Sequence, residues 1–168
     1  MRSRAYLTCA LRLCLVLHAP AWAAAGHDSV EPHVAVVTGL VAPAVTLQRA
    51  YLRDVFLKRI VIDDAGKALV PLNLPPEDPL RSAFSQVLLG KAPDALQRYW
   101  NERYFQGVSP PYVLGSQEAM LRFVAETPGA LGYVASCLVD RRVRVVADLP
   151  VPPELAAQVA AQCQGVGH

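Results

Sequence analysis

Short runs of β-branched and apolar residues alternate with stretches of helical hydrophobic spacing along most of this chain. Strand-like runs are predicted at 33–37, 58–62, 69–72, 131–135 and 143–146. Helices are predicted at 46–57, 78–89, 93–105, 116–126 and 153–162. Strands that alternate with helices indicate an α/β fold, because each helix returns the chain to start a strand in the same direction. We therefore predict a single α/β domain with a mainly parallel sheet flanked by helices.

Several helix boundaries follow from single residues. Thr46 is a candidate N-cap for the first helix. Asp78 followed by Pro79 is typical of a helix start, because the carboxylate caps free amides and proline needs no donor there. Gly90 then ends that helix.

One β-hairpin is also predicted. The Asp-Asp-Ala-Gly sequence at 63–66 indicates a tight turn between the runs 58–62 and 69–72. Pro71 lacks a backbone donor, so it places the second strand at a sheet edge or at a strand end.

The first 25 residues have the order of a secretory signal peptide. Arg2 and Arg4 precede an apolar stretch, and small residues follow at 21–25. We expect a signal peptide at 1–25 and a single domain at 26–168, placed in the periplasm. An uncleaved N-terminal anchor is the alternative.

The basic residues are unevenly distributed. Arg2, Arg4 and Arg12 account for the formal charge of +2, because the remaining 13 basic residues face 14 acidic ones. The body therefore has no basic field for nucleic acid.

Two cysteines, Cys137 and Cys163, remain after the signal segment. In an oxidising compartment we expect them to form a disulfide, and two independent buried thiols are the alternative. Without a CxxC motif or clustered histidines they do not form a zinc site. The body also offers no Ser/His/Asp set and no histidine in the predicted core, so neither an enzyme nor a cofactor is indicated.

A family resemblance rests on motifs in a fixed order. The chain has Tyr-Leu-Arg-Asp-Val-Phe-Leu-Lys at 51–58, Val-Pro-Leu-Asn at 70–73, Leu-Arg-Ser-Ala-Phe at 80–84, then Trp100, then Glu-Thr-Pro-Gly-Ala-Leu-Gly-Tyr-Val at 126–134. This order resembles the phosphate-type periplasmic solute-binding proteins, with the last segment the most specific. It implies a single periplasmic-binding-protein-like lobe over about 34–135, a ligand such as phosphate or a related oxyanion, and an ABC permease as partner. Gly129 is expected at positive φ, and Gly132 where a neighbouring backbone comes close.

Two departures separate this chain from full-length members of that family. They have two lobes that close on the anion, whereas the segments for the second lobe are largely absent here. Their SGT-like loop at the helix start is replaced by residues 73–82, Asn-Leu-Pro-Pro-Glu-Asp-Pro-Leu-Arg-Ser. Phosphate capture by that loop is therefore not implied.

An anion site is still predicted at the start of the 78–89 helix, where free amides and the helix dipole converge beyond a strand end. Asn73, Arg81 and Ser82 are the candidate donors. Asp78 either caps the helix or accepts a proton from a protonated oxyanion, and its charge opposes an anion. The alternative is that Asp78 only caps the helix.

The other candidate groups have mainly structural interpretations. Ser116 is expected to be a helix cap, and the basic cluster at 141–144 a solvated turn. The aromatic residues Tyr99, Trp100, Tyr104 and Phe105 are expected mostly in the core, and an exposed face that binds a partner is the alternative.

Two functions remain open. One is a solute-binding-like protein related to the substrate-binding proteins of phosphate or oxyanion ABC transporters. The other is a non-transport periplasmic interaction or sensor module that keeps the fold, because a single lobe cannot trap a ligand by hinge closure.

Overall fold

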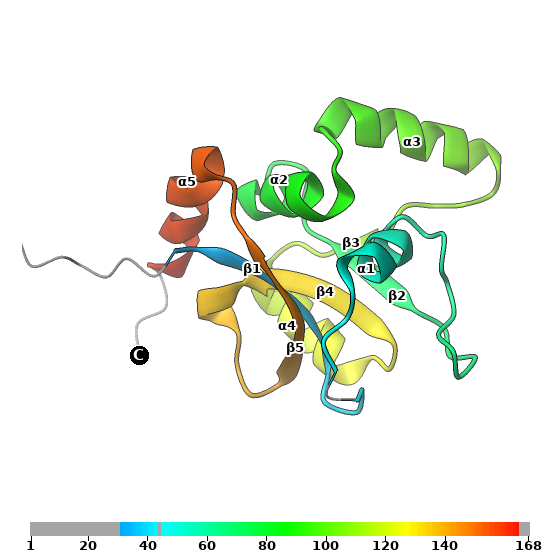
Figure 1. Ribbon diagram of the computed structural model, residues 1–168, viewed down its shortest axis with the longest axis horizontal. Coiled ribbons are helices and arrows are strands. Elements are labelled where there is room, and N and C mark those ends of the chain that lie inside the picture. The colour runs from blue at the N-terminus through cyan, green and yellow to red at the C-terminus, as the bar shows by residue number, and fades with distance from the viewer. Residues whose placement is uncertain (1–30, 44, 165–168) are drawn as a thin grey trace, which may run out of the picture.

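A five-stranded sheet in the order β3-β2-β4-β1-β5 organises the computed structural model, which describes residues 31–43 and 45–164 (Figure 1). The predicted signal peptide at 1–25 lies outside the described residues. The strands are β1 His33–Gly39, β2 Val70–Asn73, β3 Tyr112–Val113, β4 Ala130–Ala135 and β5 Val143–Pro150. The helices are α1 Arg49–Phe56, α2 Pro79–Phe84 with a π-helical extension Ser85–Leu89, α3 Pro93–Phe105, α4 Gln117–Glu126, a 3-10 turn Ser136–Leu138, and α5 Pro153–Cys163.

The predicted α/β class is confirmed, and the sheet is mixed. β2 pairs in parallel with β3 and β4. β1 pairs antiparallel with both β4 and β5, so β2 to β5 share one direction and β1 runs against them. The β4–β5 connection therefore passes over β1 to reach the sheet edge. Helical spacing and β-branched runs do not encode this strand direction.

The predicted hairpin forms only in part. The turn at 63–66 is present and joins an antiparallel bridge between Ile62 and Ala68, but the apolar run before it forms no strand and stays at the surface, with Ile62 57% exposed. β2 instead lies between β3 and β4, where both faces of the sheet are covered and Leu72 is buried. Pro71 lies near the start of β2, before the pairing with β3 begins at Leu72, as expected for a residue without a donor.

Helix starts follow the predicted caps in two of three cases. Asp78 accepts a hydrogen bond from the Leu80 amide at 2.8 Å, and Ser116 caps α4 through the Ala119 amide at 3.1 Å. Thr46 does not cap α1. The N-cap is Gln48, without a side-chain hydrogen bond, because the preceding Leu47 amide is tied to the Val146 carbonyl of β5 at 2.8 Å.

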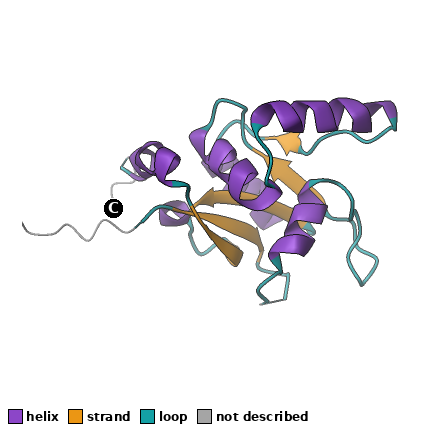
Figure 2. Cartoon of the chain, turned by 45° about the horizontal axis from the view of Figure 1, so that its top comes forward, coloured by secondary structure: helices purple, strands orange, loops and turns teal. Residues whose placement is uncertain are grey.

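Helices cover the two faces of the sheet. Successive residues of a strand point to opposite faces. At Gly132 of β4 a side chain would meet Met120 of α4, whereas the next residue, Tyr133, stacks on Phe84 of α2. The core therefore has α4 on one face and α1 with α2 on the other (Figure 2).

The segment 126–134 has the turn geometry that was expected. Gly129 has φ +80°, and a Cβ there would lie 2.1 Å from the Ala68 carbonyl oxygen, so only glycine fits. Gly132 also permits a close approach. The neighbour is the Met120 side chain, whose sulfur would lie 2.4 Å from an added Cβ, rather than a backbone as expected.

α3 stands apart from the rest of the domain at its upper edge (Figure 1). Only Leu96 of this helix is buried. The expectation that the aromatic set is mostly core is wrong for Tyr104, which is 67% exposed, and Phe105, which is 89% exposed. The apolar residues of α3 do not gather on one stripe, and the helix is held through its middle, where the Tyr99 hydroxyl donates to the Leu57 carbonyl at 2.7 Å.

The predicted disulfide is confirmed. Cys137, in the turn after β4, is bonded to Cys163 at the end of α5, with the two Cα atoms 5.9 Å apart. The bond anchors α5 beside the carboxyl end of β4. Among the described residues, no helix combines the length and apolar character needed to cross a membrane.

Candidate functional site

Predicted site residues meet where β2 ends and α2 begins. Asn73 is the last residue of β2, Asp78 is the N-cap of α2, and Arg81 lies in its first turn. All three are half-buried, and they surround the hydroxyl end of the fully buried Tyr133. We call Asn73, Asp78, Arg81 and Tyr133 the β2–α2 cluster.

Tyr133 fixes the orientation of Asn73. The Tyr133 hydroxyl donates to Asn73 Oδ1, and the Leu74 amide lies 3.1 Å from the same oxygen and 3.2 Å from the Tyr133 oxygen. Because Oδ1 accepts these bonds, the amide nitrogen of Asn73 faces away from Tyr133, and no described residue accepts a hydrogen bond from it. Two donors of Asn73 therefore stay available at the end of β2.

The pKa of the Tyr133 hydroxyl is raised well above its ordinary value. Burial is the main cause, because it penalises the phenolate, and the Asp78 charge acts in the same direction. The Leu74 amide and the Arg81 charge oppose this shift. Tyr133 is therefore a neutral donor at any physiological pH. The role of Tyr133 in orienting Asn73 could not be predicted from the sequence, in which Tyr133 is one residue of the 126–134 segment.

Arg81 is a half-buried cation without an ion pair among the described residues. Its Nη1 donates to the Leu74 carbonyl at 2.7 Å, which holds the side chain against the β2–α2 loop. The ion pairs of the described residues all lie elsewhere. Arg81 therefore keeps most of its N–H donors available for a ligand.

Asp78 is bound by two donors. Its Oδ1 accepts from the Leu80 amide at 2.8 Å and from Gln162 Nε2 of α5 at 2.9 Å. Gln162 Oε1 in turn accepts from Gln117 Nε2 at 3.0 Å, and Gln117 Oε1 accepts from the Ala135 amide at 2.7 Å. Neither glutamine was singled out in the sequence, because a polar residue on a helix gives no signal of its distant partner.

Ser82 is the weakest of the predicted site residues. It is half-buried, its amide bonds the Asp78 carbonyl at 3.2 Å, and its hydroxyl has no partner among the described residues. α2 is also only six residues long before the π-helical extension, so a large helix dipole does not develop. The side chains of Asn73 and Arg81, rather than the helix start, are what the cluster offers to an anion.

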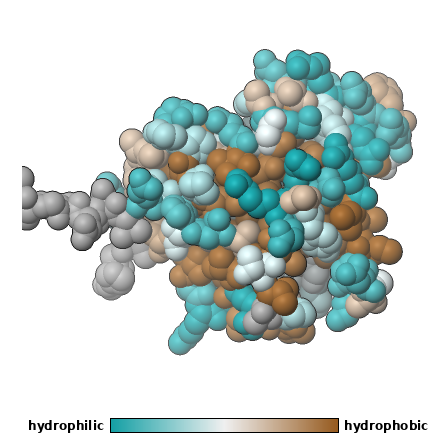
Figure 3. Space-filling view, viewed as in Figure 1, coloured by the Kyte–Doolittle hydropathy of each residue, from teal (hydrophilic) through white to brown (hydrophobic). Residues whose placement is uncertain are grey.

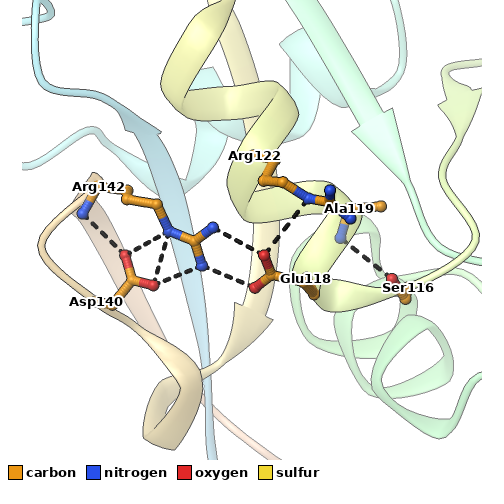
Figure 4. Close-up of polar contacts among 6 residues, drawn as sticks. All are labelled: Ser116, Glu118, Ala119, Arg122, Asp140 and Arg142. Atoms are coloured by element: carbon orange, nitrogen blue, oxygen red, sulfur yellow. Dashed lines mark hydrogen bonds and ion pairs between the residues drawn. The ribbon is translucent and has the colours of Figure 1, made fainter.

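The basic cluster at 141–144 is built into the structure. Arg142 bonds both oxygens of Glu118 at 2.8 and 2.7 Å and also contacts Asp140 at 2.6 Å (Figure 4). The hydrogen bonds from Arg142 hold the pKa values of both carboxyl groups below their usual range. This network ties the β4–β5 loop to the start of α4 and neutralises Arg142, whereas Arg141 and Arg144 have no ion pair among the described residues.

A separate cavity of about 650 Å³ opens at the other end of the sheet, beyond the last residue of β1. It is mostly apolar, and its lining includes Thr38, Tyr51 and Leu69. Apolar residues also reach the surface in the middle and on the right side of the face in Figure 3. None of the predicted site residues lines this cavity.

The described part of the chain has no group of three His, Cys, Asp or Glu side chains that could hold a metal ion.

No known protein family and no curated protein matches this chain. Solved structures do. An ABC-type phosphate transport receptor from Vibrio cholerae is 15% identical, with a TM-score of 0.57 over 80% of this chain and 64% of its own. The fold is that of one periplasmic-binding-protein lobe.

Two further structures agree. A putative phosphate ABC transporter substrate-binding protein with bound phosphate, from Clostridium perfringens, is 13% identical, with a TM-score of 0.57 over 79% of this chain and 61% of its own. PstS from Borrelia burgdorferi is 10% identical, with a TM-score of 0.55 over 70% of this chain and 47% of its own. The chain thus spans less than two thirds of the length of these proteins, and the likeness concerns the fold.

Proposed function

We propose that this protein is a periplasmic solute-binding-like protein whose single lobe binds a small oxyanion, such as phosphate, at the β2–α2 cluster. The observation that carries the proposal is Arg81, a half-buried guanidinium without an ion pair among the described residues. Removing a cation from water without a partner is costly, and an anion that binds there recovers this energy. Charge-assisted hydrogen bonds from arginine to an oxyanion are also among the stronger polar contacts.

The position of the cluster supports the same ligand class. In open α/β sheets, ligands bind outside the carboxyl ends of strands, and Asn73 ends β2 at such a place. The available amide donors of Asn73 complement the charge of Arg81. The solved structures with this fold include one described with bound phosphate. A periplasmic location and an ABC permease as partner belong to this proposal.

The Asp78 carboxylate limits what the cluster can bind. Its Oδ1 is occupied by Leu80 and Gln162, and its negative charge lowers the affinity for any fully deprotonated anion. With Asn73 and Arg81 alone opposing this charge on an open surface, we expect modest rather than tight binding.

Calorimetric titration of the protein lacking residues 1–25 with phosphate, sulfate and molybdate tests the proposal. Arg81→Ala should weaken the binding of the preferred anion by about 10- to 100-fold, the loss of a charge-assisted hydrogen bond worth about 1.5–3 kcal/mol. Arg53→Ala removes an exposed arginine of α1 and is the matched control. Equal affinities of the wild type and Arg81→Ala would remove this site.

An interaction module is the second candidate, and a specific observation favours it. Tyr104 and Phe105 of α3 are exposed, as are Tyr112 at 69% and Val113 at 53% in the edge strand β3. Exposed apolar patches are typical of protein contact sites. If the wild type releases no heat with any of the three anions, this candidate is favoured over oxyanion binding.

A further inference from the structure

Asp78 and Arg81 lie three residues apart but do not form an ion pair. Opposite charges with this spacing at the start of a helix are neighbours and normally attract each other. Both charges act on the Tyr133 hydroxyl, so both side chains lie close to it. Even so, the Asp78 carboxylate bonds Leu80 and Gln162, and Arg81 bonds the Leu74 carbonyl. The two opposite charges therefore have separate partners.

We infer that Gln162 is a positioning residue for the proposed anion site: by binding Asp78 from α5, it keeps the carboxylate from neutralising Arg81. The inference rests on the proposed function. Gln162 Nε2 lies 2.9 Å from Asp78 Oδ1 and, among the described residues, is the one donor to this carboxylate from outside α2. The Leu80 amide and Gln162 Nε2 bond the same oxygen, Asp78 Oδ1, so the two donors together fix the carboxylate, and Gln162 is the one that a substitution removes without removing the helix cap.

The orientation of Gln162 is itself determined by its neighbours. Its Oε1 accepts from Gln117 Nε2, whose own Oε1 is fixed by the Ala135 amide of β4. A backbone amide can only donate, so the order of donors and acceptors along this series admits one arrangement, and the amide nitrogen of Gln162 must face Asp78. Gln117 is buried, so water does not compete for its hydrogen bonds, whereas Gln162 and Asp78 are half-buried.

The disulfide fixes the position of Gln162, the residue that carries this series of hydrogen bonds to Asp78. Cys163 follows Gln162 directly and is bonded to Cys137 in the turn after β4. The last turn of α5 therefore cannot move away from the carboxyl end of β4 without breaking a covalent bond. Gln162 bonds Asp78 directly and Gln117 of α4 bonds Gln162, so three elements distant in sequence, α2, α4 and α5, are joined in one series. Arg81 has no ion pair among the described residues.

Replacing Gln162 tests this role. Gln162→Leu removes the donor, and Gln162→Glu keeps the shape of the side chain but places a second carboxylate beside Asp78. In both variants Asp78 should turn to Arg81, and phosphate should bind about fivefold more weakly in calorimetry, since binding must first break an ion pair. Gln158→Leu, at an exposed position of α5, is the matched control and should bind as the wild type does.

A double-variant cycle separates positioning from general damage. Asp78→Asn keeps a helix-capping side chain without the charge. In that background Gln162→Leu should leave the phosphate affinity unchanged, because no carboxylate remains to pair with Arg81. An equal loss with and without Asp78→Asn, or an unchanged affinity of both Gln162 variants, would overturn the inference.

A measurement without an anion keeps the two proposals distinct. The rate at which phenylglyoxal modifies Arg81, followed by peptide mass spectrometry, reports whether the guanidinium is paired. It should fall in Gln162→Leu and Gln162→Glu and stay unchanged in Gln158→Leu. If the wild type binds no anion, the proposed function fails and this rate still decides the inference. An unchanged Arg81 rate in both Gln162 variants overturns it.

Discussion

The ring of Tyr133 stacks on the ring of Phe84, with centroids 3.9 Å apart and planes 5° from parallel. This contact joins β4 to α2 inside the core, and the hydroxyl of the same tyrosine reaches Asn73 at the surface end of β2. Core packing therefore sets the position of the candidate site. A change in how α2 packs on the sheet moves Arg81 and Asn73 relative to each other.

Tyr133→Phe should separate these two roles. The ring keeps its stacking on Phe84, but Asn73 loses the donor that orients its amide. We expect a loss of about 1–2 kcal/mol in the free energy of unfolding, since a buried hydrogen bond is removed. Urea denaturation measures this loss. Phosphate titration should show weaker binding, and an unchanged affinity would exclude Asn73 as an oriented donor.

Gly129→Ala should be among the most destabilising single changes. Alanine at this position has an unfavourable φ, and its Cβ would overlap the Ala68 carbonyl oxygen. We expect a loss of about 3 kcal/mol or more in unfolding free energy. Gly90→Ala is the control, because it also has positive φ but no atoms within 4 Å, and it should cost only ~1 kcal/mol. Equal losses in thermal unfolding would show that the contact with Ala68 adds nothing.

Lys58→Gly should stabilise the protein. Lys58 has φ 55°, and it ends α1 in a Schellman arrangement, in which its amide bonds the Val55 carbonyl and the Arg59 amide bonds the Asp54 carbonyl. Glycine adopts this conformation without strain, so we expect a gain of about 0.5–1 kcal/mol in chemical denaturation. Lys58→Ala removes the charge but keeps the strain. A gain of the same size in Lys58→Ala would contradict the backbone explanation.

The disulfide should account for a large part of the stability of α5. Unfolded, non-reduced protein lacking residues 1–25 should show no reactive thiol in a labelling assay, because Cys137 and Cys163 are bonded. Replacing both cysteines with serine should lower the unfolding free energy by about 3 kcal/mol. Hydrogen exchange should rise first in α5. Two labelled thiols in the non-reduced protein would be incompatible with the bond.

Processing of the N-terminus is a prediction from sequence alone. We expect the exported protein to begin between Ala24 and Gly26 and to be recovered from the periplasm. N-terminal sequencing of the exported form identifies the first residue. Recovery of a membrane-bound form that starts at Met1 would instead support an uncleaved anchor.

Features that depend on neighbours along the chain could be predicted from the sequence. Asp78 and Pro79 start a helix, Gly90 ends its π-helical extension at φ 61°, and Gly129 takes positive φ, because each depends on backbone geometry within a few residues. The periodic apolar runs likewise predicted most strands and helices. The disulfide followed from compartment and cysteine count rather than from geometry.

Features that depend on distant partners were decided only by the tertiary structure. The antiparallel direction of β1, the place of β2 inside the sheet and the exposure of Phe105 depend on which surfaces meet, and local periodicity does not carry that information. The same holds for the site. Gln162 lies 84 residues from Asp78, and their hydrogen bond forms only because the fold packs α5 against α2. Sequence placed Arg81 at a helix start, but packing determined that its charge has no partner among the described residues.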